Sequence, residues 1–280
     1  MAHLEDSGRR GAQEPGNGPV AGFGRASGRQ LDRWLPGIIV SLALLLWEWA
    51  ASSGRCSALF FPAPSAIART ALRLYRSGQL TANAAATLRR VVVGLAAGGV
   101  PALVLGLAMG WSRRLYAIVD PLIAALHPVP KTAILPLIMI LFGIGETSKV
   151  VVVAMATFFP VLINAMAGVR QIHPIYLEVA ENYGASLPRT FSRVVVPGSL
   201  PAVLTGIRLG LNTALVLTIA VELVAAREGL GAMIWFAWET LRTEELYAAL
   251  AVAAALGIGF NVLVQKLSTW LVPWQVEREE

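Results

Sequence analysis

The sequence has little of what catalytic and metal-binding sites usually require. Cys56 is the one cysteine among 280 residues, which excludes an internal disulfide and a thiolate metal cluster. His127 and His173 have no partner at ligand spacing, and the sequence contains no HExxH motif and no nucleophile elbow. The sequence therefore predicts no metal site and no catalytic residues, and it leaves an integral-membrane enzyme without support.

Charge is also scarce. Only 14% of the residues are charged, and 56% are hydrophobic, with a mean hydropathy of +0.63. A soluble domain of this composition would expose large apolar patches, so most of the chain is expected to lie in lipid. The net charge of +6 does not indicate a nucleic-acid partner, because the arginines are spread among spans and loops and do not gather on one polar face.

The apolar runs predict an all-α polytopic membrane protein with about six transmembrane helices of about twenty residues each. The predicted spans are 34–51, 91–110, 132–144, 150–169, 202–223 and 246–264. Four prolines break the region 116–145, so the third span is expected to be short and kinked and to follow a half-helix. Pairs of glycines four residues apart predict closely packed span helices: Gly94 with Gly98, Gly106 with Gly110, and Gly206 with Gly210.

The chain divides into segments of different composition. Residues 1–33 lack an apolar period and are predicted to be a disordered cytoplasmic tail. Residues 34–84 hold the first span and an amphipathic connecting segment, in which 65–75 is expected to lie along the membrane interface. A transmembrane core is predicted for 85–268, followed by a cytoplasmic tail at 269–280. Positive residues beside the spans favour a cytoplasmic amino terminus, although the arginines between the first two spans count against it.

A polar stretch at 173–201 separates two strongly apolar spans. Crossing a bilayer does not require such a stretch, so it is the best place to look for a partner. It is predicted to form two short helices. Pro174 suits the first turn of one helix and Gly184 its left-handed C-terminal cap. Ser186 is expected to cap the second helix and Pro197 to end it.

Each predicted loop helix has an apolar and a polar face. The apolar faces are expected to pack on the protein's own body, and the polar faces, which carry Glu178 and Glu181 or Arg189 and Arg193, to meet a partner. The apolar residues are Tyr176, Val179, Ala180 and Tyr183 in the first helix and Leu187, Phe191, Val194 and Val195 in the second. The alternative is a loop that only covers the membrane domain.

Few polar side chains interrupt the predicted spans. Asn164, Asn212 and Thr213 could hydrogen-bond a passing oxyanion or join neighbouring helices. Because a carboxylate in hydrocarbon is costly, Glu222 is expected either to line a pathway or to form a structural pair, and on a pathway it would repel an acidic substrate. Arg208 is expected to extend its guanidinium to the cytoplasmic interface.

From Glu178 onward the residues resemble a family pattern. The similarity consists of Glu178-Val179-Ala180, Gly184, Ala185, Phe191 and the run Val194-Val195-Val196-Pro197. This looks like the EAA loop of the membrane subunits of binding-protein-dependent ABC importers of the type I fold. The segments 61–68, 87–98, 120–149 and 158–170 resemble the sulfonate, taurine and nitrate branch of that family. The resemblance covers roughly residues 60–268.

The resemblance implies a permease subunit that forms the translocation pathway for a small solute at a bacterial inner membrane. It implies four partners: two ATP-binding cassette subunits, which bind ATP and Mg²⁺, a second permease copy, and an extracytoplasmic solute-binding protein. The absence of a Walker A lysine agrees with a chain that binds no nucleotide itself. An ATP-independent secondary transporter or channel is the alternative, but such a carrier has no use for a docking helix.

The resemblance also assigns roles to residues. The coupling loop that docks on the ATPase would contain Glu178, Ala180, Gly184, Ala185, Phe191 and Pro197. The possible pathway residues are Asn164, Asn212, Thr213 and Glu222.

Overall fold

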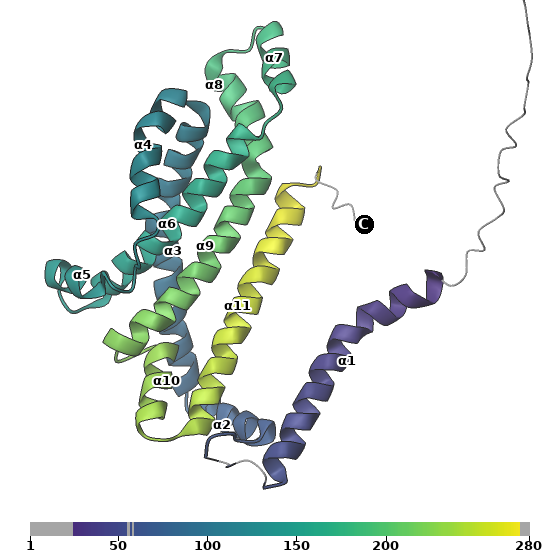
Figure 1. Ribbon diagram of the computed structural model, residues 1–280, viewed down its shortest axis with the longest axis vertical. Coiled ribbons are helices and arrows are strands. Elements are labelled where there is room, and N and C mark those ends of the chain that lie inside the picture. Colours follow the sequence, from purple (N-terminus) through teal and green to yellow (C-terminus); the bar gives the residue numbers. More distant parts are fainter. Residues whose placement is uncertain (1–24, 55–56, 58, 275–280) are drawn as a thin grey trace, which may run out of the picture. The chain divides into compact units, whose positions relative to one another are not determined.

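The computed structural model describes residues 25–54, 57 and 59–274, which form eleven α-helices and one π-helical turn and contain no β-strand (Figure 1). The all-α fold class is therefore confirmed. The chain divides into two compact units, Met1–Trp49 and Ala50–Glu280. The first unit holds most of α1 (Arg25–Ser52), whose part Trp34–Ser52 is long and apolar enough to cross a membrane, as predicted for 34–51. Residues 1–24 of the predicted tail lie outside the described residues.

Four long helices form the second unit: α3 (Gln79–Trp111), α6 (Glu146–Arg170), α9 (Val196–Ala225) and α11 (Thr243–Leu271). Together with the α1 segment they give five described helices that are long and apolar enough to cross a membrane. In Figure 1, α3, α6 and α11 run in one direction and α9 runs back between them. One end of the unit carries the short helices α7 (Pro174–Asn182) and α8 (Leu187–Thr190) and is called the α7 end. The other carries α2 (Pro64–Arg76) and α10 (Leu230–Glu239) and is called the α10 end.

The third predicted span, 132–144, is wrong as a single membrane-crossing helix. It contains α5 (Leu135–Phe142), whose eight residues reach about 12 Å, against a hydrocarbon core of about 30 Å. The preceding helix is α4 (Arg113–Leu126), and prolines 128 and 130 lie in the break between the two. Proline has no backbone N–H and disfavours helix at the residue before it, which explains why one continuous helix does not form.

Helices α4 and α5 together accompany α6 along its length. Near the start of α4, the guanidinium of Arg170 lies 4.1 Å from the ring centroid of Tyr116, and after its end the ring of His127 lies 5.3 Å from that of Phe159. In α5, Ile138 packs in a cluster with Val152, in the first third of α6. The chain between α3 and α6 thus runs from the α7 end to the α10 end as two helices, α4 and α5, separated by a proline-containing break.

Glycines permit the close approach of the long helices, as their spacing predicts. A Cβ atom at Gly98 in α3 would lie 2.1 Å from the carbonyl oxygen of Ala154 in α6, and one at Gly206 in α9 would lie 2.7 Å from the Cβ of Asn164. The backbones pack at distances that only glycine allows.

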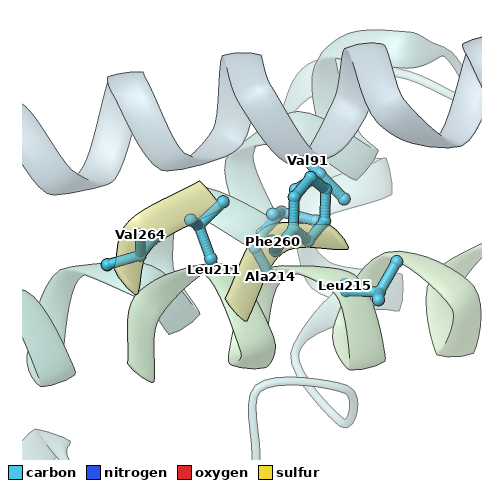
Figure 2. Close-up of a cluster of buried hydrophobic side chains, with 7 residues drawn as sticks. Val91, Leu211, Ala214, Leu215, Phe260 and Val264 are labelled. Atoms are coloured by element: carbon cyan, nitrogen blue, oxygen red, sulfur yellow. The ribbon is translucent and has the colours of Figure 1, made fainter. Parts of the chain in front are cut away.

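Apolar side chains from the four long helices meet beside this contact. Figure 2 shows Val91 from α3 facing residues of α9 and α11. The buried members of the cluster are Val91, Val153, Leu211, Ala214, Leu215, Phe260 and Val264. The cluster joins α11 to the α3–α6–α9 core.

The predicted amphipathic segment 65–75 forms α2. Its residues Ile67, Thr70 and Leu74 are buried, whereas its arginines are exposed. The hydroxyl of Thr70 donates a 2.6 Å hydrogen bond to the carboxylate of Glu244 in α11, which fixes α2 to α11.

Candidate functional site

The first loop helix forms as predicted. α7 begins at Pro174, after His173, whose Nδ1 accepts a 3.3 Å hydrogen bond from the amide of Ile175. Gly184 has a φ of +69°, the left-handed conformation that favours glycine at a helix end. The amide of Ala185 donates to the carbonyl of Ala180 at 2.9 Å, which closes the turn. A tight turn therefore sets α7 against the next helix.

The second loop helix does not end at Pro197. Ser186 occupies the N-cap position of α8 without a side-chain cap bond. The chain then passes through the π-helical turn η1 (Phe191–Val195) directly into α9, so that Pro197 lies in the first turn of α9. Pro197 has no N–H to donate, and the π-helical turn directly before it changes the hydrogen-bond pattern there. The helix therefore continues through the proline. Leu187–Ala225 is in effect one helical segment of 39 residues.

The prediction that the apolar face of α7 packs on the protein's own body is wrong. No residue of α7 is buried, and Tyr176 and Tyr183 are 61% and 88% exposed. Tyr176, Val179 and Tyr183 line an open groove of about 700 Å³ opposite Arg193 of η1. α7 therefore presents an uncovered apolar face together with the exposed carboxylates of Glu178 and Glu181.

The second loop helix is anchored. The ring of Phe191 packs edge-on against Trp111 at the end of α3, with ring centroids 5.8 Å apart, and Val195 is fully buried. Leu187, at the start of α8, is 72% exposed. The loop thus joins a fixed helix, continuous with α9, to a projecting one.

The candidate pathway residues do not form one cluster. Asn164 donates from Nδ2 to the carbonyl of Pro160, and Thr213 donates from Oγ1 to the carbonyl of Leu209, both at 2.8 Å and both within their own helices. Asn212 exchanges hydrogen bonds of 3.4 and 3.3 Å with Asn261 and so joins α9 to α11. Interhelical pairing therefore accounts for Asn212.

Glu222 lies apart from these residues, at the α10 end, and is completely buried. Its Oε1 lies 2.6 Å from Nη1 of Arg90, and its Oε2 accepts hydrogen bonds of 2.9 Å from the hydroxyl of Thr87 and the amide of Gly231. A Cβ atom at position 231 would lie 2.6 Å from the Cβ of Glu222, so glycine is needed for this approach. Of the two alternatives for Glu222, the geometry supports structural pairing.

Arg90 is the residue that sequence reasoning missed. Its Nε and Nη2 each lie 2.7 Å from a carboxylate oxygen of Glu146, which also lies 2.8 Å from Nζ of Lys149. We call Arg90, Glu146, Lys149 and Glu222 the ion cluster. It joins α3, α6 and α9, and the only sequence signal for it was an arginine at the edge of an apolar run, with partners 56 and 132 residues away.

The structure offers no obvious metal ligands. Within residues 25–54, 57 and 59–274, no group of three or more His, Cys, Asp or Glu side chains could hold a metal ion.

The chain is similar in sequence and in fold to known transport proteins. The chain is 36% identical over 254 residues to the taurine transport system permease protein TauC of Escherichia coli, covering 88% of this chain and 92% of that protein. It is 30% identical over 249 residues to the putative aliphatic sulfonates transport permease protein SsuC of Bacillus subtilis, covering 89% and 90%. A chain of the inward-facing MetNI methionine ABC transporter matches with a TM-score of 0.62 over 70% of this chain and 97% of its own; at 17% identity, this shows the fold alone.

Residues 102–276 match the model of one family, the binding-protein-dependent transport system inner membrane component. This match covers more than half of the chain and includes α7, η1, α9 and α11. The chain therefore belongs to this family and is an inner-membrane permease subunit of an ATP-binding-cassette importer with the type I fold.

Proposed function

We propose that this permease conducts a small sulfonate, of which taurine is the first to test, and that two ATP-binding cassette subunits dock at its α7 end. The similarity to TauC over nearly the whole of both chains supports the sulfonate. The ATPase subunits would supply ATP and Mg²⁺ binding, and an extracytoplasmic binding protein would deliver the solute. Membership of the importer family leaves no support for the ATP-independent alternative.

The uncovered apolar face of α7 is the observation that carries the docking proposal. Tyr176 and Val179 of α7 are 61% and 47% exposed at an end of the unit where the chain leaves the membrane. Tyr183 and Leu187, which follow α7, are 88% and 72% exposed and extend this apolar surface. Contiguous apolar surface in water marks a protein interface. The carboxylate of Glu178 would meet a basic or polar group of the ATPase, and the small Ala180, Gly184 and Ala185 would keep the loop slim enough to enter a groove. Phe191 and Pro197 would serve from the permease side, since they fix the loop to α3 and α9.

The α7 end is proposed to face the cytoplasm, with a cytoplasmic amino terminus. Arginines flank the spans at this end, which is the usual cytoplasmic bias. They are Arg113, Arg114, Arg170, Arg189 and Arg193. At the opposite end Arg90 is buried in the ion cluster and is not a loop charge, which weakens the argument against this orientation.

A second copy of the chain is proposed to complete the pathway. Asn261 is exposed on α11, and Asn212 and Thr213 are partly exposed on α9, although all three lie within spans. Polar side chains in spans face protein or a water-filled cavity, and not lipid. A partner copy over this face would provide both.

The proposal is tested by expressing the chain with its genomic neighbours and purifying it. An ATPase subunit should copurify, and proteoliposomes of the complex should take up taurine only with ATP and the loaded binding protein. Uptake by the permease alone, without nucleotide, would overturn it.

Orientation has its own test, in a Cys56→Ser background. The Ser186→Cys variant should react with a membrane-impermeant maleimide only after cells are broken. The Thr240→Cys variant, exposed beside α10, should react in whole cells. Labelling of the first variant in whole cells would place the α7 end outside.

A further inference from the structure

A polar cavity of about 480 Å³ opens between α6, α9 and α11 toward the α7 end. It is distinct from the apolar groove beside α7. Its polar lining residues are Asn164, Gln171, Thr205, Arg208, Ser268 and Thr269. Such a cavity within the span helices needs an explanation, because apolar packing predominates elsewhere along them.

Arg208 is the one charged residue that lines this cavity. Its Nε is buried and has no hydrogen-bond partner among the described residues. No carboxylate in the described part of the chain forms an ion pair with it, whereas Arg90 is paired with two. The guanidinium of Arg208 lies against this cavity, where an unpaired charge is costly; that it extends to the interface at the α7 end stays a prediction.

The other groups around the cavity leave hydrogen-bond donors unused. The amide of Asn164 donates one of its two N–H groups to Pro160. The hydroxyl of Ser268 and the side-chain amide of Gln171 have no hydrogen-bond partner within residues 25–54, 57 and 59–274. A fixed positive charge, free donors and no lining carboxylate are complementary to an anion.

We propose that this cavity is an anion-binding station of the permease, in which Arg208 holds a sulfonate or a similar oxyanion. A planar guanidinium can donate two parallel hydrogen bonds to two oxygens of such a group. Ser268 and Asn164 would donate to the remaining oxygens. The identification of the anion as the transported solute rests on the proposed function; the binding of an anion at Arg208 does not.

The same chemistry could come from the phosphate of a lipid headgroup. The cavity opens on a surface of the span helices, so a lipid could reach it. The proposal is that a free solute anion occupies the site, and the test has to distinguish the two.

The first test uses the purified permease–ATPase complex in detergent, with Cys56→Ser and Thr205→Cys. The thiol in the cavity is labelled with the anionic reagent 2-sulfonatoethyl methanethiosulfonate and with its cationic trimethylammonium analogue. The ratio of anionic to cationic rate should fall about tenfold when Arg208→Gln is added, and little with Arg208→Lys. The Thr240→Cys thiol, at the α10 end, should show no change in this ratio with Arg208→Gln.

Protection identifies the occupant. Methanesulfonate should slow anionic labelling of the Thr205→Cys variant when Arg208 is present and not in Arg208→Gln. The proposal would be overturned if the ratio of anionic to cationic labelling rates did not change with Arg208→Gln. It would also be overturned if phosphatidylglycerol protected the thiol and methanesulfonate did not.

The second test measures uptake of taurine by proteoliposomes of the complex with its loaded binding protein. Arg208→Gln should reduce uptake at least tenfold while the binding protein still stimulates ATP hydrolysis, and Arg208→Lys should retain much of the uptake. The matched control is Arg76→Gln, an exposed arginine of α2, which should transport normally. Equal loss of uptake and of ATPase stimulation in Arg208→Gln would make Arg208 a structural residue and overturn the proposal.

The two tests separate the proposals. If the unsubstituted complex does not import taurine but its labelling depends on Arg208, the sulfonate function fails and the anion site stands. If the complex imports taurine and the labelling ratio does not depend on Arg208, the anion site fails and the function stands.

Discussion

Arg90 of α3 and Glu222 of α9 form an ion pair of 2.6 Å that is closed to solvent, with side chains 2% and 0% exposed. Each partner has further hydrogen bonds: Arg90 to both oxygens of Glu146 and to the carbonyl of Glu228, and Glu222 to Thr87 and Gly231. A buried pair is tolerated when its remaining donors and acceptors are satisfied in this way. The charge of Glu222 is thereby neutralised, so it presents no barrier to an anionic solute.

Removal of one partner should destabilise the protein strongly. Arg90→Gln leaves Glu222 buried without its counter-charge, and we expect a loss of about 3–5 kcal/mol. The measurement is the thermal unfolding midpoint of the purified protein in detergent, together with its abundance in the membrane.

The neighbouring arginine provides the control for this prediction. Arg89 contacts Glu146 at 3.4 Å but its side chain is 63% exposed. Exposed pairs contribute about 0–1 kcal/mol, so Arg89→Gln should unfold at nearly the native temperature. If the two substitutions lowered the unfolding temperature equally, burial of the Arg90 pair would not explain its contribution to stability.

The surroundings of two glycines predict changes in stability of opposite sign when each is replaced by alanine. The Cβ of Gly98→Ala would lie 2.1 Å from a backbone oxygen, so the helices must separate, at a cost of about 1–3 kcal/mol. Gly259 in α11 has nothing within 4 Å, and Gly259→Ala should stabilise its helix by up to about 1 kcal/mol. Thermal unfolding of both variants checks this; a stabilised Gly98→Ala would contradict the packing.

Gly184→Asp should leave the protein inserted but uncouple uptake from ATP hydrolysis. Gly78 is a matched control, because both glycines have positive φ, +69° and +76°, and a Cβ at either position would meet no atom within 4 Å. Either aspartate has a similar backbone cost, roughly 1–2 kcal/mol, and the two variants should be equally abundant. Only Gly184→Asp, at the α7 end, should lose uptake, by tenfold or more. Normal uptake by that variant would count against a docking role for the turn.

Tyr183→Ser should weaken the association with the ATPase. The tyrosine is 88% exposed, so its removal leaves the permease fold intact but deletes apolar area from the docking face. Central aromatic residues of an interface commonly contribute about 2 kcal/mol or more, or about thirtyfold in affinity. The measurement is the ratio of ATPase to permease after affinity purification. Tyr75→Ser in α2, 60% exposed at the other end, should leave this ratio unchanged.

Features set by neighbouring residues could be predicted from the sequence. The α7 helix with its Gly184 cap and the glycine pairs of α3 and α9 follow from local backbone chemistry. The family followed from the pattern that begins at Glu178, which the comparisons confirm.

Features set by distant residues could not be predicted in this way. Arg90 and Glu222 are 132 residues apart, and no spacing rule joins them. The continuation of the helix past Pro197 depends on how the freed backbone groups are satisfied in three dimensions, whereas the break between α4 and α5 was predicted from the prolines. The exposed face of α7 was misjudged because the same amphipathic pattern suits an internal contact and a partner.

The passage from α8 through η1 into α9 has a mechanical consequence. Residues at both junctions keep helical dihedral angles, so the helical backbone continues over 39 residues from Leu187 to Ala225, a path of about 58 Å. Near its far tip Glu222 is clamped to α3 and α10. A displacement of α8 would therefore be passed along this one helical segment to the α10 end, where Glu222 holds α9 to α3 and α10.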